Sequence, residues 1–128
     1  MPVYSSVWHG NLNDRGNPEK ALLSVMLSVR NTDSRHAMTI TSVRYHDSDG
    51  RLLRDYLEQP RSLPPISSQA FFVENRETRG GAGASFLVSW RAEQPINQPI
   101  IESVHVYHWG TQAQAFTSRG QPIQSDDP

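Results

Sequence analysis

The chain has 128 residues, which is the usual length of a single domain and enough to bury a hydrophobic core of its own. Lys and Arg total 12 and Asp and Glu total 13, so the formal net charge is −1. The composition therefore lacks the basic excess that is typical of nucleic-acid-binding domains. The absence of cysteine excludes disulfides, thiolate nucleophiles and iron–sulfur clusters. No apolar run approaches the length of about 20 residues that a membrane-spanning helix needs.

The first part of the chain consists of short runs of alternating apolar residues between turn residues, which predicts β-strands. A strand is expected at residues 3–9, followed by a polar loop over residues 10–19. The strongest alternation covers residues 22–30. This run also fits helical spacing, but its short length and the polar stop at residues 31–34 favour a strand. Its apolar side chains on one face are Leu23, Val25, Leu27 and Val29.

A β-hairpin is expected in the next part of the chain. The alternation slips within the β-branched run at residues 38–46, and one extra residue near Thr41 and Ser42, a β-bulge, would restore a single inward face. Asp47–Gly50 then predicts the turn, because Asp and Gly tolerate the positive φ angles of tight hairpins. A shorter strand returns over residues 51–57.

The second half of the chain contains further strands separated by loops. Leu63–Pro65 predicts an edge or a crossover, because its two prolines lack the N–H groups that a central strand needs. Residues 79–83 are a glycine-rich loop. Strands are expected at residues 69–74, 84–91, 100–109 and 113–117.

Together these elements predict an all-β fold, a single antiparallel β-sandwich of immunoglobulin-like or fibronectin-like type with about seven or eight strands. The sandwich is expected to cover residues 1–123 as one domain, and residues 124–128 to form a polar C-terminal tail. The expected core consists of Val25, Leu27, Val29, Val43, Tyr45, Phe71, Val73, Phe86, Val88, Trp90, Val104 and Val106.

The last long strand offers a candidate binding surface. His105, Tyr107 and Trp109 share one face of it, opposite Val104 and Val106. If the valine face belongs to the core, the other three side chains form an exposed ridge that would stack on a sugar or pack against a partner protein. If the valine face is instead exposed, these three residues are part of the core.

A metal site is an alternative hypothesis. His36 and Met38 would share a face of an extended segment, and with His46, and Met26 as a further thioether, they would form an imidazole–thioether set that suits copper. Surface histidines and core-filling methionines are the simpler interpretation. His105 and His108 would face opposite sides of their strand and so would not share a metal ion.

Motifs of catalysis are missing from the chain. There is no Gly-x-Ser-x-Gly turn around a nucleophile, and the carboxylate pairs fall in turns, strand ends and the tail. Asp47–Gly50 does not match a calcium-binding loop, and Gly80–Gly83 is not followed by the Lys-Ser/Thr pair of a phosphate-binding loop. We therefore expect no catalytic residues and no cofactor, and a hydrolase with dispersed carboxylates remains only a minor alternative.

Two stretches carry a resemblance to a known family. The first runs through LSVRNTD at residues 27–33 and ITSVRYHDSDGRL at residues 40–52. The second begins with GGAGASFLVSW at residues 80–90 and ends with FTSRG at residues 116–120. Over residues 3–123 the chain resembles a small bacterial family of unknown function, domain-of-unknown-function family 3124. The resemblance implies an exported or lipid-anchored envelope protein whose leader has been removed, and it supplies no activity or site residues.

The leading functional interpretation is a non-catalytic binding or interaction module of the bacterial cell envelope or periplasm, with a cytoplasmic location as the alternative. Its partner would be a protein or a carbohydrate, and neither a nucleic acid nor a membrane-spanning role is expected. The alternative is a copper- or zinc-binding protein that uses His36, Met38 and His46. The oligomeric state stays open, because the edge of a sandwich can pair with a second chain.

Overall fold

The computed structural model describes residues 1–109 and 112–123, without the side chains of residues 108, 109 and 112. Over these residues the chain is built from strands, with one short 3-10 turn, η1. The elements are β1 (Pro2–Val3), β2 (Ser6–His9), β3 (Glu19–Leu22), β4 (Ser24–Arg30), β5 (Met38–His46), β6 (Leu52–Asp55), β7 (Arg61–Leu63), β8 (Ser68–Val73), η1 (Gly81–Gly83), β9 (Ala84–Arg91), β10 (Ile100–Trp109) and β11 (Gln112–Arg119).

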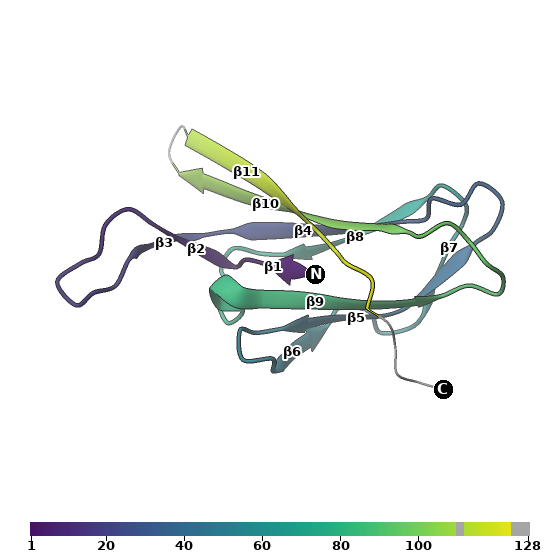
Figure 1. Cartoon of the computed structure of the whole chain (residues 1–128), viewed down its shortest axis with the longest axis horizontal. Helices are drawn as coiled ribbons and strands as arrows, with labels where there is room; N and C mark the ends of the chain where they lie inside the picture. Colours follow the sequence, from purple (N-terminus) through teal and green to yellow (C-terminus); the bar gives the residue numbers. More distant parts are fainter. Residues whose placement is uncertain (110–111, 124–128) are drawn as a thin grey trace.

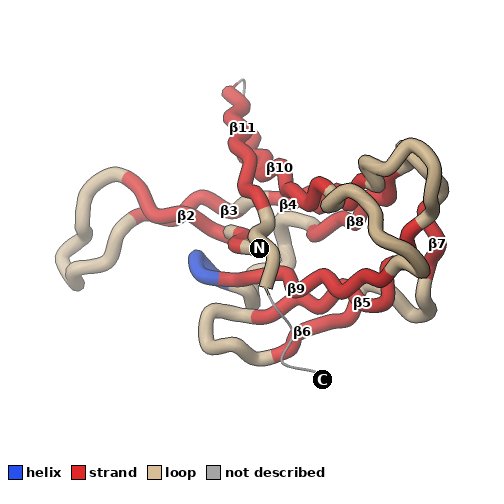
Figure 2. Tube along the Cα trace, turned by 45° about the vertical axis from the view of Figure 1, so that its right-hand side comes forward, coloured by secondary structure: helices blue, strands red, loops and turns tan. Residues whose placement is uncertain are grey.

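The strands form two larger antiparallel sheets and a separate hairpin. The five-stranded sheet has the order β1-β9-β5-β6, and β7 pairs with β5 beside β6. The four-stranded sheet has the order β11-β10-β4-β8, and β2 pairs with β3. The two larger sheets lie as layers, and the β2–β3 hairpin extends beyond one end of them (Figures 1 and 2). The expectation of an all-β, antiparallel fold is confirmed.

The hydrophobic core lies between the two larger sheets. The inward face of β4 supplies Val25, Leu27 and Val29, and that of β5 supplies Met38, Ile40, Val43 and Tyr45, all fully buried or nearly so. Burying a side chain of this size stabilises the fold by about 1.5 to 3 kcal/mol. The alternation of β4 between buried and exposed residues confirms a strand there and excludes the helix.

The expected bulge and turn are both present in the β5–β6 hairpin. The pairing of β5 with β9 shifts register between Ile40 and Ser42, and the shift returns Val43 to the core after Ile40. Asp47 closes the turn, because its Oδ1 accepts the N–H groups of Asp49 and Arg51, each over 2.9 Å. Gly50 has a φ of +82°, which glycine adopts without steric cost.

Two expectations about strand position need correction. The expected strand at residues 3–9 is broken between Val3 and Ser6, so that β1 joins the five-stranded sheet while β2 pairs with β3. On β10 the expected inward face was wrong: His105 is fully buried, whereas Val106 is 39 % exposed. The cause is the register with β4, in which His105 lies opposite Val25. Residues directly opposite in a sheet point to the same side, so His105 follows Val25 into the core.

Candidate functional site

The candidate site is a cleft beside β9, with a volume of about 830 Å³, within the range of about 300 to 1,000 Å³ that is common for ligand sites. It is lined by Met1, by residues 86–90 of β9, by Ile96, Gln98, Pro99 and Ile101 before and at the start of β10, and by residues 120–123. The chain that follows β11 crosses β9 here (Figure 1). Segments distant in sequence therefore form the cleft together.

The edge of β9 that borders the cleft is only partly covered. β1 pairs with Ala84 and Ser85, and Met1 extends this pairing by one residue. The Met1 ammonium donates to the Phe86 carbonyl over 2.7 Å, and the Phe86 N–H donates to the Met1 carbonyl over 2.9 Å. From Leu87 onward, no described strand pairs with this edge. Among the described residues, the last residues of β9 thus have no strand partner on this edge, which is called the free edge below.

The hydrogen-bonding groups of Val88 point toward this free edge. Its partner on the other side is Val43 of β5. The N–H of Val43 donates to Asp55 Oδ1 over 3.3 Å and its carbonyl accepts the N–H of Tyr56 over 2.8 Å. The backbone groups of Val43 therefore point away from β9. Val43 and Val88 are thus a pair without hydrogen bonds to each other, and in an antiparallel ladder the backbone groups of such a pair point away from the partner strand. The N–H and C=O groups of Val88, and of Trp90 two residues on, therefore face the cleft.

Trp90 shows how open the cleft is. Its position on β9 places it on the same face as the buried Phe86, and it was expected in the core. It is nevertheless 38 % exposed, and Val88 beside it is only half-buried. The core expectation for Trp90 was wrong because, within the described part of the chain, no element covers the inward face of β9 at this end, and the cleft opens there instead.

The chemistry of the lining is suited to binding. None of the described lining residues carries an ionisable side chain. The one ionisable group is the backbone ammonium of Met1, and burial lowers its pKa. Apolar side chains such as Val88, Trp90 and Ile101 offer contact area, while the free backbone groups of β9 offer hydrogen bonds. The arrangement can hold a ligand, and the described lining residues provide no side-chain acid or base.

The comparison with protein families gives a match over nearly the whole chain. The family described as "Protein of unknown function (DUF3124)" matches residues 1–123. The chain belongs to this family. Neither the curated proteins nor the solved structures gave a match. Within the described part of this DUF3124 chain, no helix is long and apolar enough to cross a membrane.

The structure places two of the three residues of the candidate aromatic ridge, His105 and Tyr107, in this DUF3124 chain. His105 is fully buried. Its Nε2 accepts the backbone N–H of Tyr4, and its ring stacks on Phe116 with the centroids 4.4 Å apart. Tyr107 is half-buried, and the side chain of Trp109 lies outside the described residues. Of the two alternatives, the core one therefore holds for His105, because the register with β4 places it opposite Val25.

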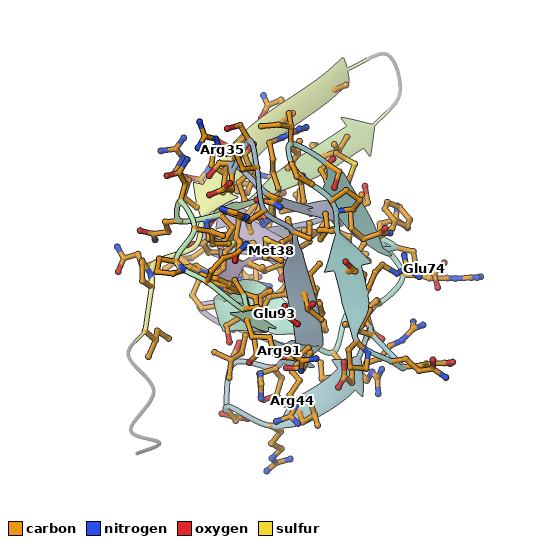
Figure 3. The ribbon with its side chains drawn as sticks, turned by 90° about the vertical axis from the view of Figure 1, so that its right-hand side faces the viewer. Arg35, Met38, Arg44, Glu74, Arg91 and Glu93 are labelled. Carbon is orange, nitrogen blue, oxygen red and sulfur yellow. The ribbon has the colours of Figure 1, made fainter. Side chains whose placement is uncertain are left out.

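The structure does not bring together the candidate ligands of the alternative metal hypothesis. Met38 is buried in the core, in the middle of the molecule, with Arg35, Arg44 and Glu74 at the periphery (Figure 3). His46 is at the other end of β5, and a strand of this length separates the two by about 26 Å. His36 instead contacts Gln94 through its Nδ1. The described residues contain no group of three His, Cys, Asp or Glu side chains with metal-site geometry.

The cleft was not predicted from the sequence. Its lining residues look like ordinary core and loop residues, and they come from four segments, Met1 included, that only the sheet topology brings together. The alternation at residues 84–91 predicts which side chains of β9 face inward, but it does not predict which other elements pack against that face.

Proposed function

We propose that this DUF3124 chain is a non-catalytic binding module of the bacterial cell envelope, and that its ligand site is the cleft beside β9. One observation carries the proposal: a free strand edge, with the backbone groups of Val88 and Trp90 directed outward, borders an apolar cleft of about 830 Å³. Free edges of this kind are normally covered or blocked, because they pair readily with other chains.

The ligand class that fits this site best is a polypeptide. Backbone N–H and C=O groups that repeat every second residue match those of another extended chain, while Trp90 and Ile101 would contact its apolar side chains. A carbohydrate site relies on stacking rings together with several polar side chains, and here the polar side chains of the described lining are only Ser89, Gln98 and Gln121.

The proposal of a non-catalytic role is supported by the same lining. General acid–base catalysis needs an ionisable group within hydrogen-bond reach of the reacting atoms. The described residues of the cleft provide only the Met1 ammonium, which is engaged with the Phe86 carbonyl.

We further infer that the two larger sheets form one sandwich of immunoglobulin-like type. The pairs β4·β8 and β5·β9 correspond to the B·E and C·F neighbours of that fold. In the immunoglobulin fold the strand after F pairs with F. Here β10 follows β9 but pairs with β4 in the other sheet, and the free edge of β9 lies where that strand would be.

The envelope location is supported by the family resemblance, and fractionation of a bacterium that expresses the native gene tests it. The protein is expected in the periplasmic or membrane fraction. Recovery in the cytosol, alongside a cytosolic marker, would remove the envelope from the proposal and leave the binding site as it stands.

Binding is tested with peptides selected from a random displayed library against the purified protein. A selected peptide should slow hydrogen exchange at the Val88 and Trp90 amides. Val88→Pro, which removes an N–H only at the free edge, should weaken binding at least about tenfold. Phe72→Ser removes an exposed apolar side chain from the other sheet and should leave binding unchanged. Equal binding to all three proteins, or a library that yields no binding peptide while oligosaccharides bind the purified protein, would overturn the polypeptide site.

A further inference from the structure

We infer that the cleft accepts an extended polypeptide strand that runs antiparallel to β9 and continues the register of β1. The inference rests on the proposed function, because it specifies how a polypeptide ligand lies in the same cleft. The occupant is a strand with two apolar side chains, two positions apart, that face into the molecule.

The direction follows from the strand already on this edge. Val3 lies opposite Ala84 and Pro2 opposite Ser85, in an antiparallel pair. Met1 and Phe86 exchange two hydrogen bonds, which is the closely bonded position of an antiparallel ladder. The same positions recur every second residue on β9, at Val88 and Trp90. A strand that continues β1 therefore meets the free groups of β9 in the pattern that β1 has begun.

The register also decides which side chains of the occupant face inward. On β1, Val3 is fully buried and Met1 packs against the core, whereas Pro2 is exposed. Side chains alternate along a strand, so the occupant's inward residues are those opposite Val88 and Trp90. Their surroundings are apolar, with Ile96 and Ile101 among the lining residues. The residues opposite Leu87 and Ser89 face outward and tolerate polar side chains.

The experiment places a short strand directly before Met1 in the full chain. In the matched version, valine occupies the second and fourth positions ahead of Met1, opposite Val88 and Trp90, with threonine between them. The control has the same residues shifted by one position, so that its valines face outward. The matched strand should slow hydrogen exchange at the Val88 and Trp90 amides at least about tenfold and raise the melting temperature. The shifted strand should do neither.

A second measurement keeps the test valid if the fused chains fold poorly. The chain has no cysteine, so Ser89→Cys introduces a single thiol on the outward face beside the cleft. A free peptide with the matched sequence and a cysteine opposite Ser89 should form a disulfide with it. The same peptide with its cysteine opposite Leu87 should react at least about tenfold more slowly. Leu87 and Ser89 lie on the same face two positions apart, so that cysteine would be about 7 Å from the thiol at position 89, too far for a disulfide without movement of the peptide.

The outcomes separate the inference from the proposed function. Equal protection by both fused strands, or equal rates of disulfide formation for the two cysteine positions of the free peptide, overturns the register and leaves the polypeptide site. Protection by the fused strand without binding of any free peptide supports the register and overturns the proposed function. Concentration-dependent dimerisation that protects Val88 and Trp90 in the wild-type chain would make a second copy the occupant and overturn the inference.

Discussion

The backbone N–H of Tyr4 donates a hydrogen bond to Nε2 of His105 over 3.1 Å, although the residues are 101 positions apart in sequence. Since Nε2 is the acceptor, the neutral imidazole carries its proton on Nδ1. The same ring stacks on Phe116 of β11. Tyr4 lies between β1 and β2, so this contact holds the segment that joins them against the four-stranded sheet. It thereby also helps to hold β1 in its pairing with β9.

This contact predicts a loss of stability in mild acid. Burial lowers the pKa of His105 below its ordinary value, and the backbone of Phe116 opposes this in part. Between the folded and the unfolded pKa the unfolded chain binds more protons, so the free energy of unfolding is independent of His105 above about pH 6.5 and falls as the pH drops below it. Urea unfolding between about pH 7.5 and 5.5 measures this slope.

Two variants identify the group responsible. His105→Gln retains an acceptor near Tyr4 but does not titrate, so its stability should fall less steeply with pH than that of the wild type. His9 lies on the exposed surface of the β2–β3 hairpin, and His9→Gln should retain the wild-type slope. Identical slopes in the wild type and His105→Gln would show that His105 is not the source.

Gly80 packs so closely against Tyr45 that no side chain fits. A Cβ at this position would lie 2.0 Å from the Tyr45 hydroxyl oxygen and 2.8 Å from Cζ, and Tyr45 is fully buried. Gly80→Ala should therefore lower the free energy of unfolding by about 1 to 3 kcal/mol, which is the usual cost of overpacking. Gly83→Ala is the matched control, because its Cβ would meet the Ser48 side chain at 3.1 Å, and a change within about 0.5 kcal/mol is expected.

Tyr45→Phe shows whether the hydroxyl causes the clash. No described group hydrogen-bonds to that hydroxyl, and burial raises its pKa to about 12. Its removal should be nearly neutral. Gly80→Ala should then cost less in the Tyr45→Phe background than in the wild type, and purely additive effects would contradict the packing described here.

Asn31 joins two loops at the end of the molecule where β4 finishes. Its side chain is fully buried. The two N–H groups of Nδ2 are shared among three carbonyl oxygens, those of His36, Leu63 and Pro64 at 2.9, 3.1 and 3.2 Å, and Oδ1 accepts the N–H of Asp33 over 2.9 Å. Asn31→Ala should cost on the order of 3 kcal/mol in urea unfolding, because it leaves several backbone groups without partners.

The aspartate variant separates hydrogen bonding from size. Asn31→Asp keeps the volume but turns a carboxylate oxygen toward the three carbonyl oxygens. At neutral pH it should be at least as unstable as Asn31→Ala, and it should recover part of the loss in acid, where the protonated carboxyl donates one hydrogen bond. An Asn31→Asp protein as stable as the wild type at neutral pH would overturn this role of the amide.

The parts of the fold that follow from local chemistry were predictable. The alternation of β4, the bulge between Ile40 and Ser42 and the turn at Asp47–Gly50 depend on residues close in sequence. The distance between Met38 and His46 also follows from their separation on one strand, so the sequence contained enough to exclude that metal set.

The face of β10 and the cleft were not predictable in the same way. Both depend on which distant strand lies beside another. His105 is inward because it lies opposite Val25 of β4, and Trp90 is exposed because, among the described residues, the distant segments that meet β9 leave a cleft over its inward face at this end. No local pattern at residues 84–91 or 100–109 records these pairings, and alternation alone fits either face.

Ile66 is held in a strained backbone conformation on the surface. Its φ is +67°, in the turn where the N–H of Ser67 donates to the Pro64 carbonyl over 3.2 Å, and its side chain is 55 % exposed. The left-handed region costs a β-branched residue about 1 to 2 kcal/mol, whereas asparagine tolerates it. Ile66→Asn should therefore raise the free energy of unfolding by on the order of 1 kcal/mol, and Ile66→Val, which retains the branch at Cβ, should leave it unchanged. Urea unfolding of the three proteins decides the point, since a destabilised Ile66→Asn would mean that contacts of the isoleucine side chain outweigh the strain.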